Sequence, residues 1–83
     1  MKIDITNVVR TNGIYTSQLW KDYYAAEVIV KVGENYLRVR YPYKVRADAE
    51  CALEQIKQKK SEIKTPAYKP LVHLMDKRGE RVL

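Results

Sequence analysis

Basic and aromatic side chains alternate with apolar ones between residues 24 and 46 of the chain. A strand places successive side chains on opposite faces, so Val28, Val30 and Val32 share one face and the side chains between them share the other. Cations beside aromatic rings are the chemistry of nucleic-acid binding, because the cations contact phosphate and the rings stack on bases. The residues that this pattern assigns to a binding surface are Lys31, Tyr36, Arg38, Arg40, Lys44 and Arg46.

A hairpin around Gly33 is expected to position these side chains. Pairing Val30 with Val39 keeps the apolar rows of both strands on one face, whereas a slip by one residue would bury arginine. In this register Lys31 lies directly opposite Arg38. Like charges in opposite positions are unfavourable in an isolated sheet, so the register predicts an anionic partner.

The same residues also have a purely structural interpretation. Lys31, Arg38 and Arg40 could form the solvated face of an antiparallel sheet, balanced by Glu27. The tyrosines could pack in the core, since the chain has seven tyrosines and no phenylalanine. Cys51 is expected to pack as a small buried hydrophobic residue. The pattern therefore leaves the binding and the structural interpretations both open.

The residue types of the chain and their spacing give little support for catalysis. His73 is the only histidine and Cys51 the only cysteine, so the sequence has no cluster with the spacing of metal ligands. None of the three glycines belongs to a phosphate-binding loop, and no nucleophile can be matched with a base and an orienting carboxylate. The sequence predicts a protein that is not an enzyme and that holds no metal or other cofactor.

Length and charge restrict the remaining classes. The chain has 83 residues, enough for one small domain, and its net charge of +6 favours an anionic partner. A lone cysteine suits a reducing compartment. No apolar run approaches the roughly 18 residues of a membrane span, and the N-terminus lacks the apolar core of a signal peptide. We therefore expect a cytoplasmic protein with no membrane partner.

Two more strands are expected before the basic hairpin. Asn12-Gly13 is the strongest short hairpin signal, because both residues tolerate the positive φ of a type I′ turn. It predicts that a strand over residues 2–10 turns back into a strand over residues 14–20. Pro42 cannot donate a hydrogen bond to a sheet, so the last strand of this meander should end there or lie at an edge.

A helix and a C-terminal extension follow the meander. From about Arg46 the apolar period changes from two to 3.6, which predicts a helix that stops by about Lys64. The fold is expected to be α+β, with an antiparallel sheet of three or four strands on one amphipathic helix. Residues 1–64 would form this domain, and residues 65–83 would form a proline-bracketed linker with a short strand at 71–75 or a hairpin.

Three short motifs occur in an order known from one class of DNA-binding domain. They are Gly13-Ile14-Tyr15, Tyr24-Ala25-Ala26-Glu27-Val28 and Tyr43-Lys44-Val45-Arg46-Ala47-Asp48-Ala49. Through them, residues 13–57 resemble the three-stranded-sheet-plus-helix domain of plant AP2/ERF factors and the related arm-binding domains of tyrosine recombinases. The resemblance implies that the outer face of the sheet enters the major groove, with Glu27 on the DNA-facing side. This chain has Ile29 where the family typically has arginine.

The sequence thus predicts a small, basic, non-catalytic protein that binds nucleic acid, DNA rather than RNA, through the outer face of its sheet. The alternative is a protein-interaction or inhibitor module of viral or mobile-element type, acting through an apolar surface or as an obligate homodimer. Ile29, Tyr36, Tyr68 and the strand at 71–75 would supply its apolar contacts. An exposed edge strand could also pair with a second copy.

Overall fold

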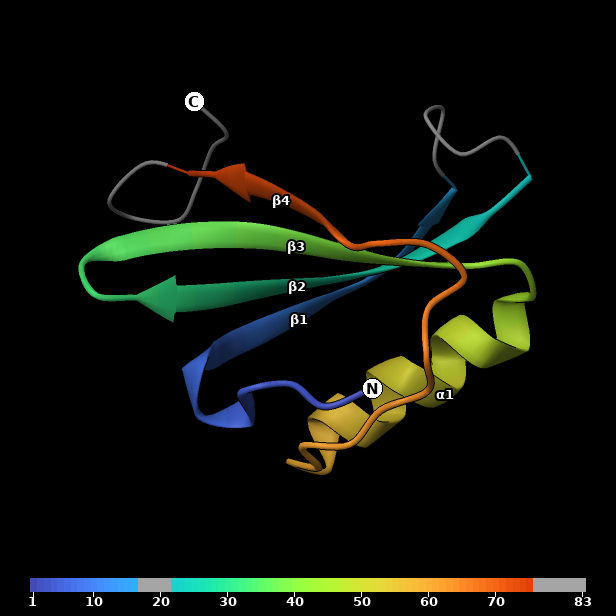
Figure 1. Cartoon of the computed structure of the whole chain (residues 1–83), viewed down its shortest axis with the longest axis horizontal. Coiled ribbons are helices and arrows are strands. Elements are labelled where there is room, and N and C mark those ends of the chain that lie inside the picture. The colour runs from blue at the N-terminus through green and yellow to red at the C-terminus, as the bar shows by residue number, and fades with distance from the viewer. Residues whose placement is uncertain (17–21, 76–83) are drawn as a thin grey trace.

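The computed structural model of the chain describes residues 1–16 and 22–75, and positions 17–21 and 76–83 lie outside these ranges. Within them, four antiparallel strands form one sheet in the order β1-β2-β3-β4, and one α-helix packs on one face of the sheet (Figure 1). This architecture confirms the predicted α+β class. The elements in chain order are a 3-10 helix (Ile5–Asn7), β1 (Val8–Thr16), β2 (Tyr24–Val32), β3 (Asn35–Tyr43), α1 (Arg46–Lys57) and β4 (Leu71–Leu74).

The hairpin predicted at Asn12-Gly13 is wrong, because β1 continues through these two residues. The register of β1 against β2 shifts between Thr11 and Gly13, and Gly13 has a φ of 120°. This is a β-bulge, for which glycine supplies the same conformational freedom that a turn would need. Residues 2–10 accordingly do not form one strand, since a 3-10 helix interrupts them. Of the expected strand over 14–20, residues 14–16 belong to β1 and the rest lies outside the described residues.

The β2-β3 hairpin forms, but in a different register from the predicted one. Its loop has only two residues, beginning at Gly33 with a φ of 61°, and positive φ at the first loop residue alone is the pattern of a type II′ turn. Lys31 therefore pairs with Tyr36, and Arg38 pairs with Ile29. The shift of two residues keeps every side chain on its predicted face. It removes the Lys31–Arg38 pair, so the like-charge argument for an anionic partner was wrong.

Pro42 lies where β3 has become an edge of the sheet. β4 pairs with β3 only from Leu37 to Arg40, so no described strand flanks β3 beyond that point. The carbonyl oxygen of Pro42 accepts a hydrogen bond from the N–H of Ala67 at 2.8 Å on this side. The nitrogen of Pro42 faces this same unpaired side, so its lack of an N–H costs no hydrogen bond of the sheet, as expected for an edge position. The predicted C-terminal strand is present as β4, and any hairpin beyond Met75 lies outside the described residues.

The core lies between α1 and the helix-facing side of the sheet. Its buried residues are Ala26, Val28, Val39, Tyr41, Tyr43, Ala49, Ala52, Leu53, Ile56 and Ile63. Four of them line one stripe of α1, at the spacing of an amphipathic helix. Cys51 lies off this stripe and is exposed, so the prediction that it is buried was wrong.

The helix ends seven residues earlier than predicted. The N–H groups of Lys59 and Lys60 donate to the carbonyls of Ile56 and Gln55, at 2.9 and 3.0 Å, and Lys59 has a φ of 63°. These two bonds around a left-handed residue make a Schellman motif, which turns the chain away from the helix axis. Ile63 still reaches the core, but from the segment after the helix.

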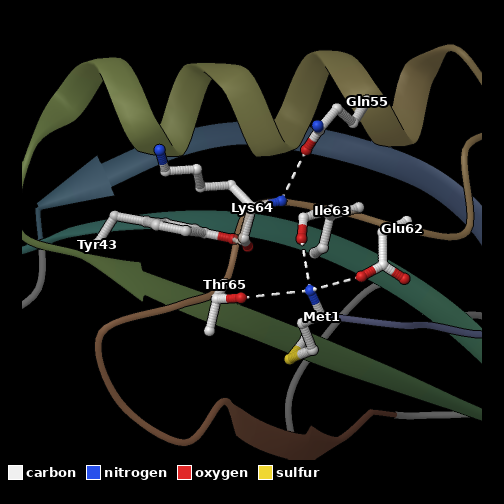
Figure 2. Close-up of polar contacts among 7 residues, drawn as sticks. All are labelled: Met1, Tyr43, Gln55, Glu62, Ile63, Lys64 and Thr65. Atoms are coloured by element: carbon white, nitrogen blue, oxygen red, sulfur yellow. Dashed lines mark hydrogen bonds and ion pairs between the residues drawn. The ribbon is translucent and has the colours of Figure 1, made fainter.

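The N-terminal segment is held against this returning segment (Figure 2). The amino group of Met1 donates to the carbonyl oxygen of Ile63 at 2.7 Å and contacts Oε1 of Glu62 at 3.3 Å. The N–H of Ile63 donates back to the carbonyl of Met1 at 2.8 Å. The hydroxyl of Tyr43 donates to the carbonyl of Lys64 at 2.6 Å, so β3 is tied to the same segment.

Stability should fall steeply in alkali because two of the core residues are tyrosines. Burial raises the pKa of Tyr41 and of Tyr43 above the ordinary value. The folded protein therefore keeps phenol protons that the unfolded chain loses, so this contribution is complete below about pH 10 and is lost as the pH rises through the folded-state pKa. We expect the free energy of unfolding to fall by up to about 1.4 kcal/mol per pH unit for each tyrosine.

Urea unfolding between pH 8 and pH 11 would measure this loss, with the variant Tyr43→Phe as the comparison. The variant loses the hydrogen bond to Lys64 at every pH, so the informative quantity is the slope of stability against pH. The slope should be shallower in the variant than in the parent protein. Equal slopes would show that the Tyr43 phenol does not control alkaline unfolding.

Candidate nucleic-acid interface

The candidate site is the outer face of the sheet, which we define as the face opposite α1. The alternation of β2 and β3 places four of the six predicted residues on it: Lys31, Tyr36, Arg38 and Arg40. The register adds Arg10 and Tyr15 from β1 and Leu71 and His73 from β4. Side chains that share a face in register are neighbours, so these residues form one surface.

A buried carboxylate lies at the centre of the outer face. Glu27 is 5% exposed, and its Oε1 accepts a hydrogen bond from Nε of Arg40 at 2.6 Å. Its Oε2 accepts one from Nδ2 of Asn12 at 2.8 Å, which the bulge in β1 makes possible by turning Asn12 toward β2. Burying a carboxylate this deeply is unfavourable unless it is paired and hydrogen-bonded, as it is here. Arg40 is therefore a structural partner of Glu27 as well as a surface cation.

Arg38 is held less tightly than Arg40. Its Nε lies 3.5 Å from Oε1 of Glu27, which makes an ion pair but not a hydrogen bond, and this buried Nε has no hydrogen-bond partner among the described residues. The side chain is 22% exposed. Because a guanidinium carries five N–H donors, Arg38 retains capacity to bind an anion while it faces Glu27.

Aromatic rings support two cations of this face. The guanidinium carbon of Arg40 lies 5.5 Å from the centre of the Tyr15 ring, and Nζ of Lys31 lies 5.5 Å from the centre of the Tyr36 ring. Both distances are within the range of cation–π attraction. The rings limit how far these cations can swing, so the side chains are partly ordered before any ligand arrives.

Lys44 and Arg46 are not part of the same group. Lys31 lies next to the β2-β3 turn, whereas Lys44 follows Tyr43, which pairs with Tyr24 at the opposite end of the hairpin. Lys44 is exposed. Nε of Arg46 contacts Oε1 of Glu50 at 3.1 Å on the first turn of α1, and both side chains are exposed. The structure therefore does not bring these two residues together with the other four on the outer face.

Sequence reasoning missed several contributors to the outer face, among them Asn12, Tyr15 and His73. The Asn-Gly pair predicts a turn, so the sequence pattern does not predict the hydrogen bond from Asn12 to Glu27. Tyr15 alternates with Gly13 and could have been assigned to this face once β1 was known to be continuous. His73 pairs with Arg38, and this could not be foreseen because the position of β4 depends on the path of the chain after α1.

Residues 1–16 and 22–75 give no support for a metal site or for a helix that crosses a membrane. No cluster of three or more histidine, cysteine, aspartate or glutamate side chains could hold a metal ion there. No helix within these ranges is long and apolar enough to cross a membrane. The cations and rings of the outer face are thus the strongest chemical grouping that we find in this part of the chain.

Comparison of the chain with protein-family models, with curated proteins and with solved structures finds no match.

Proposed function

We propose that the protein binds nucleic acid without catalysis, through the outer face of its sheet. The observation that supports this proposal is the charge of that face: Lys31, Arg38 and Arg40 lie on it together with one carboxylate among the described residues, that of Glu27. These residues of β2 and β3 carry two more positive charges than negative ones. A basic patch with interleaved tyrosines is typical of surfaces that contact phosphate and stack on bases.

DNA is the favoured ligand because of the resemblance of residues 13–57 to AP2/ERF and arm-binding domains, which stays a prediction. In this proposal Arg38 and Arg40 contact phosphate oxygens, and Tyr36 stacks on a base or sugar. Glu27 holds both guanidinium groups near their binding positions before contact, which lowers the conformational entropy that these side chains lose on binding. Lys44 and Arg46 then add phosphate contacts at the far end of the hairpin.

Fluorescence anisotropy of labelled double-stranded DNA, single-stranded DNA and RNA at two salt concentrations would test the proposal. The informative variant is Lys31→Gln/Lys44→Gln, because both lysines are exposed and neither contacts Glu27. We expect affinity to fall roughly tenfold per lysine at about 0.1 M salt, and the salt slope to decrease by about 0.9 per lost contact.

The matched control is Lys57→Gln/Lys60→Gln, which removes the same charge from exposed positions at the C-terminal end of α1. Equal weakening by both double variants would mean that net charge acts without a defined surface. Absence of binding to all three ligands at low salt would refute the proposal.

An apolar cleft supports protein interaction as a second candidate function. It lies on the helix-facing side of the sheet, is open to solvent and has a volume of about 400 Å³, and its lining is mainly apolar, with Met1, Ile3, Val30, Val39 and Val72 among the lining residues. Binding there would bury apolar surface and would hardly respond to salt. The anisotropy and salt measurements therefore separate the two functions.

A further inference from the structure

β4 carries backbone groups that no described strand pairs. The N–H of Met75 donates to the carbonyl of Tyr36 at 2.9 Å, so the hydrogen-bonding groups of Met75, and by alternation those of His73, point toward β3. The N–H and C=O groups of Val72 and Leu74 consequently point away from β3. Within residues 1–16 and 22–75, no strand lies on that side of β4, which Figure 1 shows at one edge of the sheet.

This edge also exposes apolar side chains. Val72 is 55% exposed and Leu74 is 46% exposed, and both share the helix-facing side with Val32, which is 50% exposed. The strand contains no lysine, glutamate, aspartate or proline, the residues by which proteins usually protect an edge. The opposite edge is different, because two register shifts distort β1 and make it a poor template for pairing.

We propose that this edge is a self-association surface, on which β4 of a second copy pairs antiparallel about a twofold axis through His73. In this register Val72 lies opposite Leu74 of the second copy, and Leu74 lies opposite Val72. Each of these pairs exchanges two N–H···O=C bonds, so the outward groups of both residues are satisfied in both copies. On the helix-facing side, the valine and leucine side chains of each pair then pack against one another.

Other registers of the same pairing are less favourable. An axis through Val72 would place Leu74 opposite Pro70, which has no N–H to donate. An axis between two residues would place an outward-pointing residue opposite an inward-pointing one, so no ladder could form. Among twofold registers confined to residues 70–74, the register centred on His73 is thus the one in which the N–H and C=O groups of Val72 and Leu74 all form hydrogen bonds.

In the resulting dimer the described strands of the two copies would form one continuous sheet, with both outer faces on the same side. The strand itself adds no repulsion between fixed charges, since it contains no lysine, arginine, aspartate or glutamate. Two four-residue strands bury less than the roughly 1,000 Å² of a stable interface, so the dimer should be weak and dependent on concentration. Dimerisation of this kind does not require the proposed nucleic-acid binding.

Sedimentation velocity of the full chain at pH 8, from about 10 µM to about 1 mM, would test the proposal in the range of weak affinities. We expect the mean sedimentation coefficient to rise with concentration toward that of a dimer. The variant Val72→Lys should stay monomeric across the range. The matched control is Val9→Lys on β1, which replaces an equally exposed valine on the opposite edge and should associate like the parent protein.

A second variant, Val72→Pro, removes one outward N–H and leaves the bonds to β3 in place, so it should also be monomeric while melting near the parent temperature. A parent protein that stays monomeric up to the highest concentration would overturn the proposal. So would equal association of Val72→Lys and Val9→Lys, because the edge of β4 would then have no special role.

Discussion

The variant Arg40→Glu is expected to unfold the domain. Its new carboxylate would lie beside Glu27, which is 5% exposed and accepts its shortest hydrogen bond from Arg40, at 2.6 Å. Removing one partner of a buried ion pair costs about 3–5 kcal/mol, and a like charge adds repulsion to that cost. This is much of the roughly 5–15 kcal/mol that stabilises a typical small domain. Far-UV circular dichroism during urea unfolding would measure the loss.

The control is Lys31→Glu, which reverses a charge on the same outer face at an exposed position. It loses only the contact with Tyr36, so stability should change by about 0.5–1 kcal/mol. A further comparison is Arg40→Met with and without Glu27→Leu. The double variant should recover stability that Arg40→Met loses, because no unpaired buried carboxylate remains. An Arg40→Glu variant as stable as the parent protein would contradict the ion-pair geometry of Glu27.

This expectation determines which substitutions can test binding. Because Arg40 and, more weakly, Arg38 stabilise Glu27, a loss of binding after reversing either arginine could reflect unfolding. Exposed lysines are better probes of the outer face, since their removal leaves the buried carboxylate paired.

The variant Leu53→Asp is the second change with a large expected effect, again loss of the folded state. Leu53 is 7% exposed on the stripe of α1 that packs against the sheet, in a cluster that includes Val28 and Tyr41. Aspartate there would remove about 2–5 kcal/mol of packing and would bury a carboxylate with no partner among the described core residues. Circular dichroism and thermal melting should show no cooperative transition.

Cys51→Asp is the matched control, because Cys51 lies two residues earlier on the same helix and is exposed. Aspartate has a similar helix propensity to cysteine, so the expected change is within about 0.5 kcal/mol. If Leu53→Asp melted cooperatively near the parent temperature, α1 could not be packed as the structure has it.

On the outer face, the alternation of the sequence predicts the face of each side chain but not its partner on the neighbouring strand. Lys31, Arg38 and Arg40 were assigned to the correct face although the predicted register was wrong by two residues. Side chains alternate with a period of two, so an even shift preserves faces and changes only the partners across the strands. The partner of Arg40 is Glu27, and that pair determines whether the arginine is replaceable.

Local sequence patterns predicted the wrong structure where the same residues suit two different backbone geometries. The Asn12-Gly13 pair suits a type I′ turn and also suits a bulge, and the continuous pairing of β1 with β2 decided for the bulge. Ile63 matched the helical stripe, yet the left-handed Lys59 had already ended α1. In both cases contacts between distant segments outweighed local propensity.

The sequence by itself determined which side chains lie on which face of β2 and β3, that one amphipathic helix covers the sheet, and that the chain is strongly basic. Those properties depend on the period of apolar residues and on composition, which are local. Only the tertiary structure decided that Glu27 is buried between two arginines, and that no strand within residues 1–16 and 22–75 pairs with the far edge of β4. Both depend on strand register and on the path of the chain after α1, which are set by packing between residues far apart in the sequence.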